Sequence, residues 1–218
     1  MLVKDCMTRH PILIAPETPA AEAQKIMAEN KVRHLPVVGD GKKLLGLITR
    51  QRLALKPDTL ASLDVWEIAR YLSNLTVKDL MLKIDEVQTI ASDRTVERAA
   101  RIMTDHKIGC LPVVEEGVVT GILSEVDLLK SYQEMLGLTA EGVRVTVRAP
   151  DRAGEGAKLM AALAQRGWKV TGLGIFYLPK YPGFYDAVVK IEGVTKAEAE
   201  DVVSQVPDQE IVDIREVV

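Results

Sequence analysis

Gly121-Ile-Leu-Ser-Glu-Val-Asp127 is the stretch that decides the fold, because a second version of it, Gly46-Leu-Ile-Thr-Arg-Gln-Arg52, stands earlier in the chain. Each version predicts a short apolar strand that ends in a hydroxyl residue and is followed at once by a helix. The two versions differ in their last residue, which is Asp127 in one and Arg52 in the other. We expect that difference to separate the functions of the two stretches.

The rest of the chain repeats in the same register. Leu35-Pro-Val-Val38 recurs as Leu111-Pro-Val-Val114, and Lys4-Asp-Cys-Met7 recurs as Lys78-Asp-Leu-Met81. Recurrence of this kind indicates two copies of one structural unit. Each copy has too small a core to be stable alone, so we expect the two copies to pack on each other.

Each repeat reads as a β-α-β-β-α unit, which makes the fold class α+β or α/β. The first repeat is predicted to cover residues 1–55 and the second residues 76–136. In the first, we expect a strand over Ile12–Ile14 and then a helix with Thr18 as N-cap and Pro19 at its first position. A hairpin formed by the recurring Leu-Pro-Val-Val block and the strand of the opening stretch follows.

Two further segments complete the chain. Residues 56–75 have an amphipathic pattern and are predicted to form a helical linker, whose aromatic residues Trp66 and Tyr71 could serve a dimer contact. Residues 140–218 show a different order, β-α-β-β-α-β, which is the split-βαβ or ferredoxin-like arrangement. We therefore expect a third domain there.

Composition excludes several classes of function. The 218 residues carry a formal net charge of −3, and no apolar run approaches the length of a membrane span, so neither nucleic acid nor a membrane is an expected partner. The N-terminus lacks the apolar segment of a signal peptide, and we expect a cytoplasmic protein. Cys6 and Cys110 form no disulfide framework or metal cluster, and Cys110 reads as a buried apolar residue.

No catalytic or cofactor motif stands out in the chain, so we expect no catalytic residues, no cofactor and no enzyme activity. The Ser124-Glu-Val-Asp127 sequence has two compatible interpretations. It can be a capping box, with Ser124 at the N-cap and an acid three residues later. The same geometry can bind a nucleotide, because a helix N-terminus attracts phosphate and a carboxylate can accept both ribose hydroxyls.

The pattern resembles the tandem CBS domain pair, or Bateman module. It consists of Gly, two apolar residues, Ser or Thr and, three residues further on, Asp, and it follows an apolar-Pro-Val-Val strand by some ten residues. That resemblance implies a pseudo-twofold pair with two clefts for adenine nucleotides: AMP, ADP, ATP or S-adenosylmethionine. In one cleft Asp127 would hold the ribose and Ser124 and Arg33 the phosphate. The residues implied for this nucleotide-binding cleft are Ile12, Val32, Arg33, His34, Leu35, Ser124 and Asp127.

The second cleft departs from the family pattern. Arg52 stands where an Asp is expected, and a guanidinium cannot accept a hydrogen bond from a ribose diol, although it can meet a phosphate. We therefore predict one ordinary nucleotide site and a second, degenerate cleft that is empty or binds differently. For His34, simple packing before Leu35 stays an equal alternative. The residues implied for the degenerate cleft are Thr49, Arg52, Val87, Ile108, Gly109, Cys110 and Leu111.

The third domain resembles the ACT family in its element order and in the turn Asp151-Arg152-Ala153-Gly154, where Ala153 replaces the family's Pro. The resemblance implies an amino-acid site at this turn and pairing of chains. The alternative is that Gly154 only permits tight packing of strand and helix. Five of the chain's aromatic residues also crowd one hairpin, as an interface or as core: Phe176, Tyr177, Tyr181, Phe184 and Tyr185.

Two CBS-like repeats followed by an ACT-like domain resemble the AcuB-type proteins, which are named for acetoin utilization. This implies a regulatory protein that senses an adenosine ligand, forms a homodimer and acts on a partner enzyme. The alternative is a structural or interaction protein with vestigial clefts that assembles or tethers a partner enzyme.

Overall fold

The structure is a computed structural model that describes residues 1–54, 75–138 and 141–217. The chain divides into two compact units, Met1–Leu128 and Leu129–Val218. The predicted linker over residues 56–75 lies, except for Leu75, outside the described residues. Over the three described ranges, we find no helix with the length and apolar character needed to cross a membrane.

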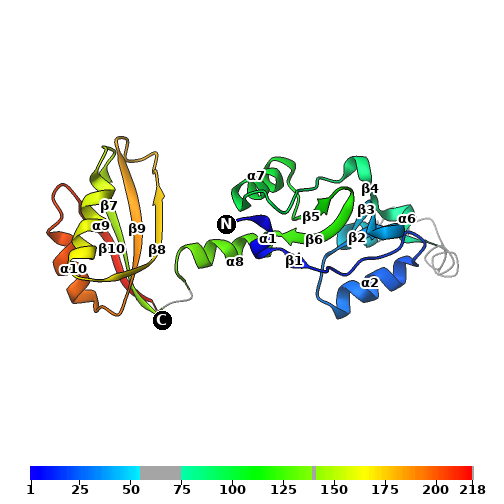
Figure 1. Cartoon of the computed structure of the whole chain (residues 1–218), viewed down its shortest axis with the longest axis horizontal. Coiled ribbons are helices and arrows are strands. Elements are labelled where there is room, and N and C mark those ends of the chain that lie inside the picture. The colour runs from blue at the N-terminus through cyan, green and yellow to red at the C-terminus, as the bar shows by residue number, and fades with distance from the viewer. Residues whose placement is uncertain (55–74, 139–140, 218) are drawn as a thin grey trace. The chain divides into compact units, whose positions relative to one another are not determined.

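The first unit contains both repeats (Figure 1). Each repeat has a short helix and a two-residue strand at its start, then a longer helix and a β-hairpin. The elements of the first repeat are α1 (Val3–Cys6), β1 (Thr8–Arg9), α2 (Ala20–Glu29), β2 (His34–Val38), η1 (Asp40–Lys42), β3 (Leu44–Thr49) and α3 (Arg50–Leu53). Those of the second are α6 (Val77–Leu80), β4 (Leu82–Lys83), η2 (Ile84–Glu86), α7 (Val96–His106), β5 (Cys110–Glu115), β6 (Val118–Ser124) and α8 (Glu125–Met135).

The two repeats exchange their first strands. One sheet has the order β1-β6-β5 and another β2-β3-β4, so β1 of the first repeat pairs with β6 of the second, while β4 of the second pairs with β3 of the first. Both pairings are antiparallel. We call residues 1–9 and 75–83 the exchanged arms.

The exchanged arms also complete the apolar cores. Val3 donates its N–H to Arg94 O and Val77 donates its N–H to Thr18 O, each at 2.8 Å. The side chain of Val3 is fully buried in the core of the second repeat, and that of Val77 is fully buried in the core of the first. Neither core is complete without the other repeat, which confirms the prediction that the two pack together.

The glycine that opens each recurring stretch is explained by the arms. A Cβ built on Gly46 would collide with Leu82 O, and one on Gly121 would lie 2.6 Å from Met7 Sδ and 3.1 Å from Thr8 O. The Leu82 carbonyl leaves no room for a Cβ at Gly46, and at Gly121 a Cβ would require the Met7 side chain to move. Glycine thus lets the arm of one repeat cross the hairpin strand of the other. The recurring glycine is therefore a consequence of the exchange of arms.

Two predictions at the start of the first repeat were wrong in detail. Ile12–Ile14 is not a strand, because only Ile14 forms a bridge, which is parallel to Val37. Ile14 donates its N–H to Pro36 O and accepts the N–H of Val38. The helix begins at Ala20 with Pro19 as N-cap and without a side-chain cap. The backbone of Thr18 instead bonds Ala15 O through its N–H and Val77 through its carbonyl.

The second unit has one four-stranded antiparallel sheet with the order β10-β7-β9-β8. Helices α9 and α10 lie on one face of this sheet (Figure 1), and the core of the unit forms between them and the sheet. The predicted order β-α-β-β-α-β is the one observed, while kinship with the ACT family stays a prediction. The elements are β7 (Gly142–Pro150), α9 (Glu155–Gln165), β8 (Lys169–Phe176), β9 (Phe184–Glu192), α10 (Lys196–Ser204) and β10 (Glu210–Val217).

The residues that follow α8 lie close against β8 in the second unit. A Cβ on Gly137 would lie 2.8 Å from Thr171 O, and one on Gly172 would collide with the carbonyl of Leu136. On the neighbouring strand β9, opposite Gly172, Lys190 is 2% exposed. Its amino group has no hydrogen-bond partner in the described part of the chain. Burial of an amino group without a partner is costly.

Candidate functional site

Ser124 and Asp127 form the capping box that begins α8. The Asp127 carboxylate accepts hydrogen bonds from the N–H and the hydroxyl of Ser124 at 2.8 and 2.6 Å, and Ser124 Oγ accepts the N–H of Asp127 at 3.4 Å. The capping interpretation is therefore confirmed. One carboxylate oxygen carries both of these bonds, so binding of a ribose at Asp127 would have to share or replace them.

Arg33 brings the first repeat to this helix start. Its Nη2 donates a hydrogen bond to Glu125 Oε1 at 2.6 Å, and both side chains are about half exposed. Burial lowers the pKa of the neighbouring His34, as does Arg33, while Glu125 raises it. The positive charge at this helix start is that of Arg33, beside Glu125.

The remaining residues implied for the first cleft differ in accessibility. Ile12 is exposed, at 36%, and Val32 is half-buried against the core of the first repeat. Leu35 is 1% exposed, so its side chain is taken up by that core. The structure thus brings Arg33 to the Ser124 box but assigns Leu35 to packing.

A cavity of about 1290 Å³ opens within the first unit, and both repeats line it. Arg33 and His34 reach this cavity, whereas Ser124 and Asp127 are not part of its lining. The cavity is thus the second cleft, not the one that the sequence favoured. It is lined by the predicted residues Thr49, Arg52, Val87, Ile108, Gly109 and Cys110.

Thr49 and Arg52 repeat only half of the capping box. Thr49 Oγ1 accepts the N–H of Arg52 at 3.2 Å, as Ser124 does for Asp127. Arg52 cannot return a bond as an acceptor, and its Nη2 instead lies 3.8 Å from Glu86 Oε1, with both side chains 48% exposed. This long, exposed ion pair leaves the Arg52 guanidinium available to a ligand.

The apolar part of the lining includes Cys110, which is 2% exposed. Burial raises the pKa of its thiol to about 12, so the group is neutral at pH 7, as expected for a buried apolar residue. Val87 and Ile108 are half-buried beside it. An apolar wall of this kind suits the face of a base.

The two repeats differ in side-chain size at one position of the cavity lining. The residue two positions before Leu35 is Arg33, whereas the residue two positions before Leu111 is Gly109. Arg33 extends to Glu125, whose carboxylate also lies beside Gly109, where a Cβ would come within 3.3 Å of Oε2, and all three residues line the cavity. Sequence reasoning missed Arg50 and Lys107, which also line the cavity, although alignment of the repeats already placed Arg50 opposite Glu125.

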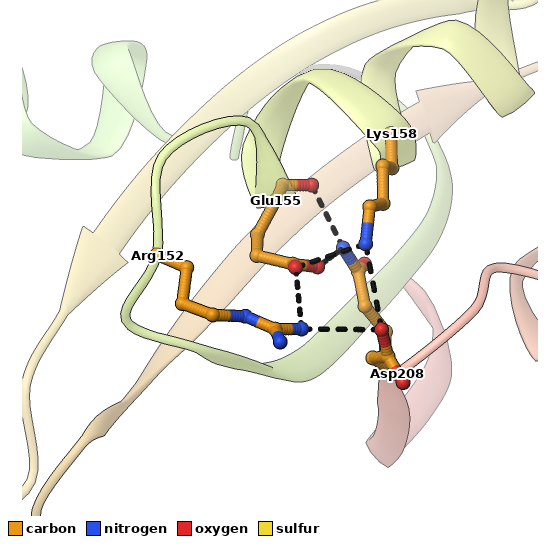
Figure 2. A network of polar contacts seen from close by, with 5 residues as sticks. Arg152, Glu155, Lys158 and Asp208 are labelled. Carbon is orange, nitrogen blue, oxygen red and sulfur yellow. Dashed lines mark hydrogen bonds and ion pairs between the residues drawn. The ribbon is translucent and has the colours of Figure 1, made fainter.

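The Asp151–Gly154 turn carries a network of charges in the second unit (Figure 2). Glu155, 2% exposed, accepts bonds from Arg152 at 2.8 Å and from Lys158 at 2.9 Å. Asp208 lies 3.1 Å from the same Arg152 guanidinium and 3.6 Å from Lys158 Nζ. The positive groups nearest the turn are therefore already paired.

Gly154 is required by its backbone conformation. Its φ is +93°, and a Cβ built on it would meet nothing within 4 Å. The alternative that this glycine only permits close packing of strand and helix is therefore wrong. The turn needs glycine to reach a left-handed conformation at the N-cap of α9.

The aromatic residues of the hairpin divide between core and surface. Tyr185 is 7% exposed and belongs to the core, and Tyr181 lies under Arg148, whose guanidinium carbon is 3.5 Å from the ring centroid. The other three are exposed, at 40% to 64%: Phe176, Tyr177 and Phe184. Within the described residues, we find no group of three His, Cys, Asp or Glu side chains placed to hold a metal.

Known proteins are similar to part of the chain. The chain is 32% identical over 128 residues to inosine-5′-monophosphate dehydrogenase of Bifidobacterium longum, which is 58% of this chain and 21% of that enzyme. It is 29% identical over 164 residues to the same enzyme of Aquifex aeolicus, or 74% of this chain and 31% of the enzyme. The chain therefore spans about a fifth to a third of these enzymes.

Two solved structures have a similar fold. The acetoin utilization protein AcuB of Vibrio cholerae is 29% identical, with a TM-score of 0.53 over 64% of this chain and 95% of that chain. CBSX2 of Arabidopsis thaliana, solved in complex with AMP, is 26% identical, with a TM-score of 0.50 over 60% of this chain and 95% of that chain. Residues 3–56 and 77–134 each match the sequence profile of the CBS domain. These two segments make up just over half of the chain, which therefore belongs to the CBS domain family.

Proposed function

We propose that this protein is a non-catalytic, cytoplasmic regulatory protein that binds an adenine nucleotide between its two CBS repeats. The observation that carries the proposal is the cavity of about 1290 Å³ lined by residues of both repeats. It is large enough for a nucleotide, and it combines cations, a hydroxyl and an apolar wall. The complex of CBSX2 with AMP supports the same ligand class for this chain.

The cleft at Ser124 and Asp127 is the second part of the proposal. Arg33 from the first repeat and Ser124 from the second lie beside the N-terminus of the 11-residue helix α8. A phosphate bound there would face a cation, a hydroxyl and the positive end of a helix dipole. Since a ligand in either cleft contacts both repeats, it favours one packing of the pair, provided that it binds the two packings with different affinity.

Thermal melting with AMP, ADP, ATP and S-adenosylmethionine tests this function. A ligand present at 100 times its Kd should stabilise the protein by about 2.7 kcal/mol. If none of the four ligands at millimolar concentration shifts the melting temperature, the proposal is wrong. For the Asp127 cleft, Asp127→Ala should reduce the stabilisation by AMP.

The matched control is Glu198→Ala. Glu198 caps α10 as Asp127 caps α8, because its carboxylate accepts the N–H and hydroxyl of Thr195 at 2.8 and 2.7 Å. Both substitutions remove the acid of a capping box and leave its N-cap hydroxyl in place. Only the change at Asp127 should alter the response to nucleotide. An equal response in both variants would assign Asp127 to capping alone.

The proposal extends to an amino acid at the Asp151–Gly154 turn. A ligand carboxylate there would compete with Glu155 and Asp208 for Arg152. Melting with the common amino acids, each with wild type and Arg152→Ala, tests this extension. A stabilisation by one amino acid that disappears in the variant is expected.

A second candidate function is supported by the exposed apolar residues of the second unit. Ile175, Tyr177 and Phe184 are exposed at 53%, 64% and 43%. A patch of this kind favours a homodimer or a docked partner enzyme. Sedimentation of wild type and Phe184→Ser, with and without AMP, separates the two functions. If the clefts are vestigial, assembly of the protein would not respond to nucleotide.

A further inference from the structure

The two clefts differ at the position that would hold the ribose. In the Ser124 cleft that position is Asp127, a carboxylate that accepts hydrogen bonds from hydroxyl groups. In the cavity it is Arg52, whose guanidinium has donors only. A free ribose diol and Arg52 are therefore poorly matched.

The charges around the cavity favour an anion. Its basic lining residues are Arg33, Arg50, Arg52 and Lys107, and its acidic ones are Asp79, Glu86 and Glu125. Glu125 is bound to Arg33, and Asp79 is engaged by the N–H and hydroxyl of Thr76 at 2.9 and 2.7 Å.

Three cations remain available. Arg50 and Lys107 have no acidic partner within 4 Å among the residues that the structure describes, and Arg52 has only the long pair with Glu86. The lining therefore offers more positive charge than its own carboxylates neutralise. A ligand with more than one phosphate group would use this charge.

We propose that the cavity binds a nucleotide whose ribose carries a phosphate at its 2′ or 3′ position, and that Arg52 binds this phosphate. The inference rests on the proposed nucleotide function and names the ligand class of one cleft. Guanidinium and phosphate match in charge and in bidentate geometry. Dinucleotide-binding folds use the same exchange, an acid for a ribose diol and an arginine for a ribose phosphate.

Isothermal titration with 5′-AMP, adenosine 2′,5′-bisphosphate and adenosine 3′,5′-bisphosphate tests the proposal on the full chain. One of the bisphosphates should bind wild type at least tenfold tighter than AMP binds the cavity, and the two isomers show which ribose position is read. Arg52→Ala should lower the ratio of bisphosphate to AMP affinity by about 10- to 100-fold, the range for loss of a charge-assisted bond. Arg52→Asp should reverse the preference toward AMP.

Arg98→Ala is the matched control, because Arg98 is an exposed arginine of α7 that does not line the cavity. It should leave the ratio within about twofold of wild type. If AMP binds but neither bisphosphate is preferred, or if Arg52→Ala leaves the ratio unchanged, the assignment of Arg52 is overturned and the proposed function stands. If no adenine nucleotide binds wild type, the proposed function is overturned as well.

Discussion

Arg33 Nη2 lies 2.6 Å from Glu125 Oε1, and this ion pair links the residue before strand β2 of the first repeat to the first residue of helix α8 in the second. Because both side chains are half exposed, the pair itself contributes little stability, about 0–1 kcal/mol. Its importance lies in competition, since a nucleotide phosphate at Ser124 would bind the same guanidinium and be repelled by the same carboxylate.

Glu125→Gln should therefore increase the affinity for AMP several-fold. The amide leaves Arg33 without its ionic partner and removes the repulsion of the phosphate, while the free energy of unfolding changes by less than about 1 kcal/mol. Isothermal titration measures the affinity. Glu29→Gln, which breaks the exposed Lys25–Glu29 pair on α2, is the control. An unchanged or weaker affinity in Glu125→Gln would place the phosphate elsewhere.

Gly46→Ala should destabilise the first unit by more than about 2 kcal/mol, because the new Cβ meets the backbone of the crossing arm. Gly121→Ala should cost less, because its closest contact is the flexible side chain of Met7. Gly156→Ala is the control: it lies in α9, its Cβ would meet only Tyr185 Oη, at 3.6 Å, and alanine favours a helix by about 0.5–1 kcal/mol. Urea unfolding measures all three. Wild-type stability in Gly46→Ala would contradict the exchanged arrangement.

Lys190→Met should raise the free energy of unfolding by about 1–2 kcal/mol, since it replaces a buried amino group that has no partner among the described residues with an apolar side chain of similar length. Lys169→Met, at an exposed residue of β8 that pairs with Glu192, should be nearly neutral. Urea unfolding at pH 7 compares them. A loss of stability in Lys190→Met would show that the amino group has an unrecognised role.

Glu155 should make the second unit sensitive to acid. The hydrogen bond from Lys158, with those from Gln209 and Arg152, lowers the pKa of this carboxyl below its usual value of about 4.3, against the opposing effect of desolvation. A lowered pKa in the folded state means that the stabilisation is complete above pH ~4.3 and is lost as the pH falls through the folded value.

The test compares urea unfolding of wild type and Glu155→Gln from pH 7 to pH 3. The advantage of wild type should be constant near neutral pH and should shrink below pH ~4. Glu200→Gln, at an exposed position of α10, should follow wild type throughout. Parallel curves for wild type and Glu155→Gln would mean that the carboxylate is not stabilised by its neighbours.

The elements that the sequence predicted well are those whose pattern is local. The hairpin of β2 and β3 follows from its apolar strands and turn residues, and its bounds differ from prediction by a residue or two. The repeat itself was evident because both copies keep the same residues at matching positions.

What the sequence did not predict depends on contacts between the repeats. The strands β1 and β4 have two residues each, which is too short for an alternation of apolar and polar residues to be visible. The sequence near the arms therefore did not indicate that they are exchanged. The cavity depends on how side chains of both repeats meet along its walls, and no local sequence pattern shows such contacts. For the same reason the favoured cleft, at Asp127, is not the one where the cavity lies.

The exchanged arms also determine when each core can be completed while the chain is being synthesised. Val3 leaves the ribosome long before strands β5 and β6, yet its place is in the core that those strands build. The first repeat likewise lacks Val77 until well after its own residues have been made. A nascent chain of about one repeat should therefore lack a complete core. Residues 1–9 reach their native contacts only after strands β5 and β6 have been made.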